Sequence, residues 1–258
     1  MRRFFLDREK ILSDRPTLAG PDVKHIRTVL RLKPGDEIFL FDGEGLEYRA
    51  RITDSTPDAI ILSVMEQSPS ITESPVQITI GQALLKARSM DRIVRQVTEL
   101  GIYAFIPVCA ERSVPRPEPG RWAEKEKRWE RIARESLKQC GRSQIPRLGP
   151  PVSFKTLVGT SKAYDLRIIF HHGKAGLKSR PYPWDTGDMR RVLALIGPEG
   201  GFTPEEVKLA LEWGFARVSL GPRILKADTA AVAACAILQY AFGDVGIPQK
   251  KLDKGYSV

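Results

Sequence analysis

Leu193-Ala-Leu-Ile-Gly-Pro-Glu-Gly-Gly201 and Val218-Ser-Leu-Gly-Pro-Arg-Ile-Leu225 decide how the C-terminal part of this chain folds. Each stretch begins with an apolar run and reaches a Gly-Pro pair, which predicts a buried strand that enters a tight turn. Between them, Thr203-Pro-Glu-Glu206 predicts a helix start, with Thr203 as the cap and Glu206 closing a capping box. Two such turns at the same ends of neighbouring parallel strands predict a crevice that binds a ligand.

Working outward, the same half of the chain predicts further β-α-β units. Residues 76–81 form an apolar run, residues 86–101 carry one apolar helical face that ends at Gly101, and residues 104–108 are apolar again. A long charged helix is expected over 121–139 and another strand over 166–170. This alternation predicts an α/β domain with a mostly parallel sheet.

The first 70 residues predict a small β-rich domain. Strands are expected at 38–41, 48–52 and 59–64, and Asp22 is expected to cap a helix that runs to about Leu32. The polar, proline-containing stretch 68–75 is the predicted linker. The expected organisation is a first domain over 1–70, a second over 74–246 and a frayed tail over 247–258.

The charge of the chain favours a polyanionic partner. The 258 residues carry a net charge of +10, and residues 86–147 hold 15 Lys and Arg against 8 Asp and Glu. A basic surface without a specific ligand is the alternative, but this concentration favours nucleic acid, because phosphate neutralisation is the usual reason for such a concentration of charge. No apolar run could span a bilayer, and the start lacks a signal peptide, so we expect a cytoplasmic protein.

The glycine-rich turns allow more than one interpretation. Gly197-Pro-Glu-Gly-Gly201 lacks the Lys-Ser/Thr ending of a phosphate loop, and Pro198 removes one backbone donor. Each turn alone could be structural, whereas the two together favour a crevice of backbone amides and apolar groups that suits a flat ring such as adenine. His171 and His172 end a predicted strand, and because the third histidine is distant, we predict no metal site.

At this point the residues resemble a known family. Leu195-Ile-Gly-Pro-Glu-Gly-Gly201, Leu220-Gly-Pro-Arg-Ile-Leu225 and Asp228-Thr-Ala230 are similar to motifs of the ribosomal RNA small subunit methyltransferase E family. Further matches are Val29-Leu-Arg31 with Gly35, Phe41-Asp-Gly43, Glu99-Leu-Gly101, Glu111-Arg112 and Gln139-Cys-Gly-Arg142. The resemblance covers nearly the whole chain, although Lys226 and Asp228 stand where the family commonly has arginine and glutamate.

The resemblance implies a SPOUT-superfamily enzyme that methylates N3 of one uridine in 16S ribosomal RNA, with S-adenosylmethionine as cofactor. It also implies an N-terminal PUA-like β-barrel that binds RNA, a C-terminal α/β domain with a trefoil knot, and a homodimer. Two alternatives stay open. One is a related methyltransferase that acts on a ribose hydroxyl or on transfer RNA, and the other is a ribosome-assembly RNA-binding protein without catalysis.

The resemblance further implies roles for individual residues. Arg223 would stabilise charge on the uracil, and Asp228 or Glu199 would accept the N3 proton, although capping of the last helix is the stronger interpretation of Asp228. The expected cofactor residues are Phe170, His171, Gly197, Gly200, Leu220, Gly221, Ile224 and Leu225. The expected RNA contacts are basic: Arg3, Lys24, Arg27, Arg31, Arg88, Arg112 and Arg142.

Three of these basic residues come from one short segment. Lys24, Arg27 and Arg31 have the spacing of one helical face, which is either an RNA-facing stripe or a solvated helix surface. Arg142 lies in the glycine turn beyond the charged helix, where we expect backbone donors to be free for an anion.

Overall fold

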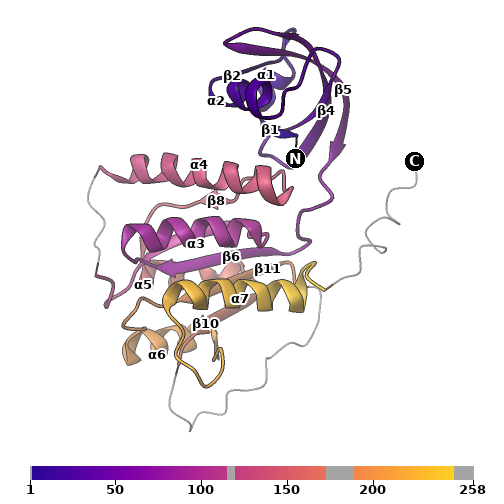
Figure 1. Cartoon of the computed structure of the whole chain (residues 1–258). Helices are drawn as coiled ribbons and strands as arrows, with labels where there is room; N and C mark the ends of the chain where they lie inside the picture. Colours follow the sequence, from indigo (N-terminus) through magenta and orange to yellow (C-terminus); the bar gives the residue numbers. More distant parts are fainter. Residues whose placement is uncertain (1, 115–119, 173–188, 247–258) are drawn as a thin grey trace. The chain divides into compact units, whose positions relative to one another are not determined.

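The chain forms two units in a computed structural model that describes residues 2–114, 120–172 and 189–246 (Figure 1). Unit 1 comprises Met1–Glu73 and Arg134–Ile145, and unit 2 comprises Ser74–Ala133 and Pro146–Val258. The segment Arg134–Ile145, which the sequence analysis assigns to the second domain, therefore groups with the first. The predicted tail 247–258 lies outside the described residues.

Unit 1 is built on a five-stranded sheet with the strand order β1-β3-β4-β5-β2. The β1–β3 pair is parallel and the other pairs are antiparallel. Alternation explains the core: Tyr48, Ala50 and Ile52 of β4 are buried, whereas Arg49 and Arg51 between them are exposed. The elements are β1 (Arg3–Phe5), α1 (Arg8–Ile11), β2 (Thr17–Ala19), α2 (Pro21–Lys24), β3 (Glu37–Phe41), β4 (Leu46–Ser55) and β5 (Ala59–Pro69).

The helix expected from Asp22 to Leu32 is shorter and less regular than predicted. It consists of α2, with Gly20 at the N-cap position, followed by a π-helical turn over His25–Val29. Asp22 lies inside the helix and accepts hydrogen bonds from Lys138 Nζ at 2.9 and 3.2 Å, so its predicted capping role is wrong. Because the π-helical turn changes the residue spacing and Arg31 follows it with a φ of 54°, the predicted single helical face does not form.

The turn that contains Arg142 is closed by a carboxylate of the chain itself. Glu73 accepts from the Arg142 guanidinium at 2.7 Å and from the backbone N–H groups of Ser143 and Gln144 at 2.8 and 2.9 Å. The donors that we expected to be free for an external anion are therefore occupied. Arg3 is buried in the same unit and pairs with Glu47 at 3.1 Å.

The described residues of unit 2 form a sheet of seven parallel strands. The order is β12-β10-β11-β6-β7-β8, and β9 also pairs with β7. The strands are β6 (Gln77–Ala83), β7 (Ala104–Cys109), β8 (Arg147–Leu148), β9 (Val152–Ser153), β10 (Leu166–Phe170), β11 (Arg191–Ile196) and β12 (Ala216–Val218). The parallel sheet predicted from the β-α-β pattern is thus confirmed.

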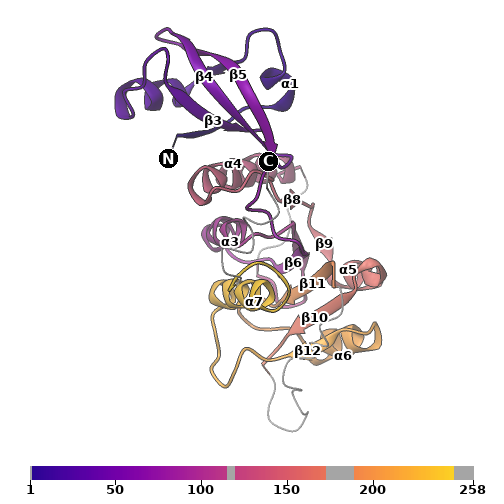
Figure 2. The same ribbon diagram turned by 90° about the vertical axis from the view of Figure 1, so that its right-hand side faces the viewer.

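Helices cover both faces of this sheet, which explains why its central strands are apolar on both sides. In unit 2, α3 and α7 lie side by side on one face (Figure 1), and α5 and α6 lie on the other (Figure 2). In β6, Ile78 and Ile80 pack toward α3 and α7, whereas Gly81 faces Leu157 of α5. The helices are α3 (Ala87–Glu99), α4 (Trp122–Cys140), α5 (Phe154–Gly159), α6 (Pro204–Glu212) and α7 (Ala227–Phe242).

Two wider observations concern the part of the chain that the structure describes. None of its helices is long and apolar enough to cross a membrane. Within the same residues, no group of three or more His, Cys, Asp and Glu side chains is arranged to hold a metal ion.

Candidate functional site

Three parallel strands of unit 2 end at one edge of the sheet. Phe170 at the end of β10 lies opposite Ile196 at the end of β11 and opposite Val218 at the end of β12. The two strands with glycine-rich turns are therefore separated by β10 and not adjacent. The loops that begin at His171, Gly197 and Ser219 meet at this edge, as expected of a ligand site in a parallel sheet.

These loops line a cavity of about 130 Å³, which we call the strand-end pocket. Seven of the eight predicted cofactor residues line it: Phe170, His171, Gly197, Leu220, Gly221, Ile224 and Leu225. The eighth, Gly200, does not line it, and its carbonyl instead accepts a hydrogen bond from Arg112 at 2.9 Å. Because β12 ends at Val218, Ser219 and Leu220 belong to the pocket wall and not to the strand.

The first glycine-rich turn is closely packed. A Cβ atom at Gly197 would lie 3.3 Å from Gly201 Cα and from the backbone nitrogen of Phe202. Gly201 has a φ of 67° and donates to the Pro198 carbonyl at 2.8 Å. Glycine is required here because the two arms of the turn approach without room for side chains.

The strand-end pocket suits a ligand with an uncharged ring and a polar part. Its walls combine apolar side chains, such as Phe170 and Leu225, with the backbone of the two glycine-rich turns. This part of the wall offers apolar surface and backbone hydrogen-bond donors and acceptors, which fits the adenosine part of S-adenosylmethionine.

The surroundings of His171 in this pocket favour its uncharged form. Burial lowers the pKa of His171 below its ordinary value of 6.5, and the positive charges of Arg217, His172 and Arg112 lower it further. An uncharged imidazole avoids placing another positive charge beside a positively charged sulfonium ligand.

Acidification is expected to destabilise the protein through His171. The unfolded chain takes up this proton near pH 6.5, whereas the folded chain does so only at lower pH. The contribution is therefore fully present above pH 6.5 and is lost as the pH falls through the folded pKa. Thermal unfolding of the parent and of His171→Asn between pH 7.5 and 5 checks this, and the parent should lose more stability. Equal losses in the two proteins would contradict the lowered pKa.

A second, larger groove adjoins the pocket. Its volume is about 510 Å³, and it shares Glu199, Ile224, Leu225 and Ala227 with the strand-end pocket. Ser89 and Arg92 of α3 line its other side. Since one wall belongs to both cavities, a substrate in the groove would lie directly beside a cofactor in the pocket.

Asp228 is held in this groove by an ion pair. Its Oδ2 atom accepts from Arg92 at 3.0 Å, and its Oδ1 atom accepts from the Thr229 backbone N–H at 2.9 Å. The N-cap position of α7 is Lys226 and carries no side-chain cap bond, so the capping role predicted for Asp228 is wrong. Arg92 was missed by the sequence analysis, because no local pattern signals a partner 136 residues away.

The two other predicted catalytic residues lie at the junction of the cavities. Arg223 and Glu199 both line the strand-end pocket, and Glu199 also lines the groove. Across the described ranges, neither side chain forms an ion pair or a side-chain hydrogen bond. Both therefore remain available to a substrate, in contrast to Asp228.

Glu206 ties a neighbouring loop to the first glycine-rich turn. The predicted capping box is confirmed: Glu206 Oε2 accepts from the Thr203 N–H at 2.9 Å, and Thr203 accepts from the Glu206 N–H at 3.2 Å. The other oxygen, Oε1, accepts from the Glu111 N–H at 2.9 Å. This second bond fixes the residue before Arg112, whose guanidinium binds the Gly200 carbonyl.

The substitution Glu206→Gln should keep the capping box and remove the hydrogen bond from the Glu111 N–H. Glutamine still closes a capping box with its one carbonyl oxygen, but its NH₂ group cannot accept from Glu111. We expect a loss of about 1.5–3 kcal/mol in the free energy of unfolding, as for a buried hydrogen bond to a charged group. Chemical denaturation and amide exchange at Glu111 measure it, with the exposed neighbour Glu205→Gln as control. An unchanged exchange rate at Glu111 would disprove the link.

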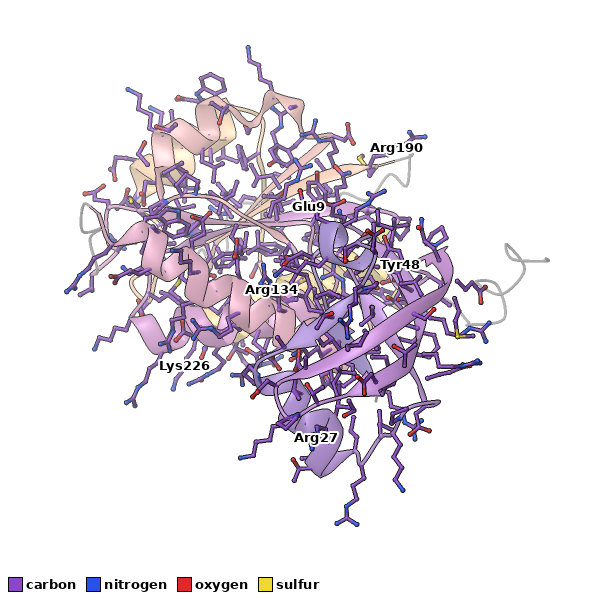
Figure 3. All side chains as sticks on the ribbon, turned by 90° about the horizontal axis from the view of Figure 1, so that it is seen from above. Glu9, Arg27, Tyr48, Arg134, Arg190 and Lys226 are labelled. Atoms are coloured by element: carbon purple, nitrogen blue, oxygen red, sulfur yellow. The ribbon has the colours of Figure 1, made fainter. Side chains whose placement is uncertain are left out.

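The predicted RNA contacts separate into two groups. Arg3 and Arg142 are buried in ion pairs with Glu47 and Glu73, so their guanidinium groups cannot reach RNA. The other five are exposed, and Figure 3 labels one of them, Arg27: Lys24, Arg27, Arg31, Arg88 and Arg112.

Comparison with known proteins agrees with the fold. The family model of the RNA methyltransferase domain matches residues 72–239, and that of the RNA methyltransferase PUA domain matches residues 18–65. Ribosomal RNA small subunit methyltransferase E of Bacillus subtilis (strain 168) is 30% identical over 248 residues, which are 93% of this chain and 96% of the relative. The Synechocystis enzyme of the same name is 32% identical and covers 88% of this chain and 74% of its own length.

A solved structure is similar over nearly the whole chain. It is a ribosomal RNA small subunit methyltransferase E from Neisseria gonorrhoeae bound to S-adenosyl methionine. Its TM-score is 0.80 at 32% identity, and the match covers 95% of this chain and 99% of that chain.

The parallel sheet with its strand-end pocket and the two matching domains define an RNA methyltransferase with a PUA domain. The first unit is accordingly PUA-like, as predicted. The chain belongs to the ribosomal RNA small subunit methyltransferase E family.

Proposed function

We propose that this enzyme methylates N3 of one uridine in 16S ribosomal RNA of the small ribosomal subunit, with S-adenosylmethionine as the methyl donor. The observation that carries the proposal is the shared wall of the strand-end pocket and the groove, which sets a cofactor site beside a substrate site. The relatives named above are ribosomal RNA small subunit methyltransferases, and one is bound to S-adenosyl methionine.

When bound, S-adenosylmethionine supplies a methyl group on a positively charged sulfur. The predicted cofactor residues of the strand-end pocket would hold its adenosine part, and the neutral His171 would add no repulsive charge. The residues of the chain then have two tasks, which are to align uracil N3 with the methyl group and to manage the proton that N3 loses.

Glu199 is the better proton acceptor of the two carboxylates. Both oxygens of the Asp228 carboxylate already have partners, one in Arg92 and the other in a backbone N–H, so this group is less available to a substrate. Glu199 faces both cavities without such partners in the described part of the chain. As the N3 proton passes to Glu199, negative charge spreads to the uracil carbonyl oxygens, where Arg223 would stabilise it.

The proposal includes the trefoil knot and a cytoplasmic location. It also includes a homodimer, which the surface of α7 supports. Helix α7 carries small and apolar residues on its accessible side, and Tyr240 beyond them is 74% exposed. Such a surface fits a second copy of the chain packed closely against it. Sedimentation of the parent protein and of Tyr240→Glu tests this surface, and a monomeric parent would rule it out.

Nucleoside analysis tests the proposed reaction. Small subunits that lack the modification are incubated with labelled S-adenosylmethionine, and the expected product is N3-methyluridine. Label on ribose or in transfer RNA would favour a related methyltransferase reaction. Tight binding of cofactor and RNA without any label would favour an assembly factor.

A further inference from the structure

Unit 2 contains another cavity, at the edge of the sheet opposite the strand-end pocket. It has a volume of about 230 Å³ and is lined by the first residues of four strands, among them Gln77 of β6 and Arg191 of β11. Because all strands of this sheet are parallel, these first residues lie at the amino edge, whereas the strand-end pocket lies at the carboxyl edge. We call this cavity the amino-edge cavity.

None of the residues that line the amino-edge cavity belongs to a helix of the described ranges. Gly81 of β6 packs against Leu157 of α5, whereas Thr79, two residues earlier on the same face, lines the cavity. Polar side chains such as Gln77 and Thr79 therefore line this part of the face, whereas apolar side chains pack against the part near Gly81.

Two arginines at the cavity are each stacked on a tyrosine. The Arg147 guanidinium carbon lies 4.9 Å from the centre of the Tyr103 ring, and that of Arg191 lies 5.4 Å from the Tyr164 ring. A guanidinium over an aromatic ring makes a cation–π contact that leaves its N–H donors for other partners. Within the described residues, neither arginine forms an ion pair.

The Asp165 carboxylate beside Arg191 is already engaged by the backbone. Asp165 Oδ2 accepts from the backbone N–H groups of Arg190 and Arg191 at 2.9 and 2.8 Å, and Arg190 is labelled in Figure 3. The side chains of Gln77, Thr79, Tyr103 and Tyr164 add uncharged polar groups that make no hydrogen bond within the residues described. The cavity thus offers two oriented cations and four unused polar groups.

We propose that the amino-edge cavity binds the phosphate backbone of the RNA substrate. Planar guanidinium groups match the oxygens of a phosphate in a two-pronged geometry, and their free faces can stack on an unpaired base. The proposal rests on the proposed function for the identity of the RNA. It adds a contact of the catalytic unit itself, remote from the methyl-transfer site.

The test compares RNA binding of the parent with that of the double variant Arg147→Gln, Arg191→Gln. Binding of unmodified 16S ribosomal RNA is measured by filter retention over a series of salt concentrations. Each lost phosphate contact lowers the slope of log K against log salt by about 0.7 for single-stranded RNA, so we expect a decrease of about 1.4. Affinity should fall about tenfold or more at low salt, while affinity for S-adenosylmethionine stays unchanged.

A matched variant removes the same charge elsewhere on unit 2. Lys155→Gln with Lys208→Gln changes two exposed lysines on α5 and α6 that do not line the cavity, and its salt slope should stay close to that of the parent. The double variant Arg147→Lys, Arg191→Lys keeps the charge and should keep the slope while losing part of the affinity. If the glutamine variant does not fold, the lysine variant still tests the proposal, because it should lose affinity for RNA while the salt slope stays unchanged.

Three outcomes would overturn the proposal. One is an unchanged slope in the folded glutamine variant, and another is an equal decrease in the lysine control, which would indicate a general charge effect. The third is uridine monophosphate binding that depends on Arg147 and Arg191 while RNA binding does not, which would assign the cavity to a free nucleotide. A parent protein that binds RNA in this way but yields no N3-methyluridine would refute the proposed function and leave the cavity assignment intact.

Discussion

Gly197→Val is expected to weaken binding of S-adenosylmethionine by about 10- to 100-fold, since overpacking of a tight site costs about 1–3 kcal/mol. A Cβ atom at this position already lies 3.3 Å from Gly201 Cα and Phe202 N, and valine adds two further carbons. Backbone atoms cannot rotate away as a side chain can, so the turn must open and the wall of the strand-end pocket must move. Isothermal titration calorimetry of the cofactor measures the loss.

Gly159 provides the matched control for this substitution. It lies in α5, and a Cβ atom there meets only Trp213 at 4.0 Å. The pair Gly197→Ala and Gly159→Ala therefore adds one methyl group at a tight and at an open position, and only the first should reduce cofactor affinity. A folded Gly197→Val protein with parental affinity would show that the cofactor binds outside the strand-end pocket.

Local sequence signals predicted the parts of the site that depend on neighbouring residues. The apolar run before Gly197 and the capping box of Thr203 and Glu206 both have the predicted form. Each is decided within a few residues, through strand burial or through hydrogen bonds to the first turn of a helix. The family resemblance added the identity of the cofactor, which no local pattern contains.

Contacts between distant segments of the chain could not be predicted from local sequence signals. The sequence does not state that β10 separates the two strands with glycine-rich turns, because strand order depends on packing of the whole sheet. It also does not show that Glu73 fills the turn around Arg142, or that Arg92 binds Asp228. Arg142 is buried with Glu73 and Arg3 is buried with Glu47, whereas a basic residue considered without its partner is assigned to RNA.

The difference between Asp228 and its expected role has a simple local cause. Lys226 has the extended backbone of an N-cap residue, so α7 begins two residues earlier than a cap at Asp228 requires. Asp228 then lies in the first turn, where a carboxylate is stabilised by the helix dipole and can reach across to α3. In this position Asp228 does not cap α7, and its carboxylate instead binds Arg92 at the wall of the groove.

Arg223→Gln is expected to lower kcat for RNA methylation by about 100-fold, the usual effect of removing one donor to a developing negative charge. Arg223 lines the strand-end pocket and is exposed, and no carboxylate pairs with it among the residues described. A cation left unpaired beside the groove would serve the charge that forms on the uracil oxygens after N3 loses its proton. Single-turnover methylation at saturating cofactor and RNA measures the step.

Two comparisons distinguish this role from RNA binding. Arg223→Lys keeps the charge and should recover part of kcat, whereas loss of a phosphate contact would raise KM for RNA and leave kcat unchanged. Arg95→Gln removes an exposed arginine of α3 that lines neither the pocket nor the groove, and its kcat should remain close to that of the parent. A rise in KM alone for Arg223→Gln would move Arg223 from the reaction to substrate binding, because a group that acts only on the transition state leaves ground-state affinity unchanged.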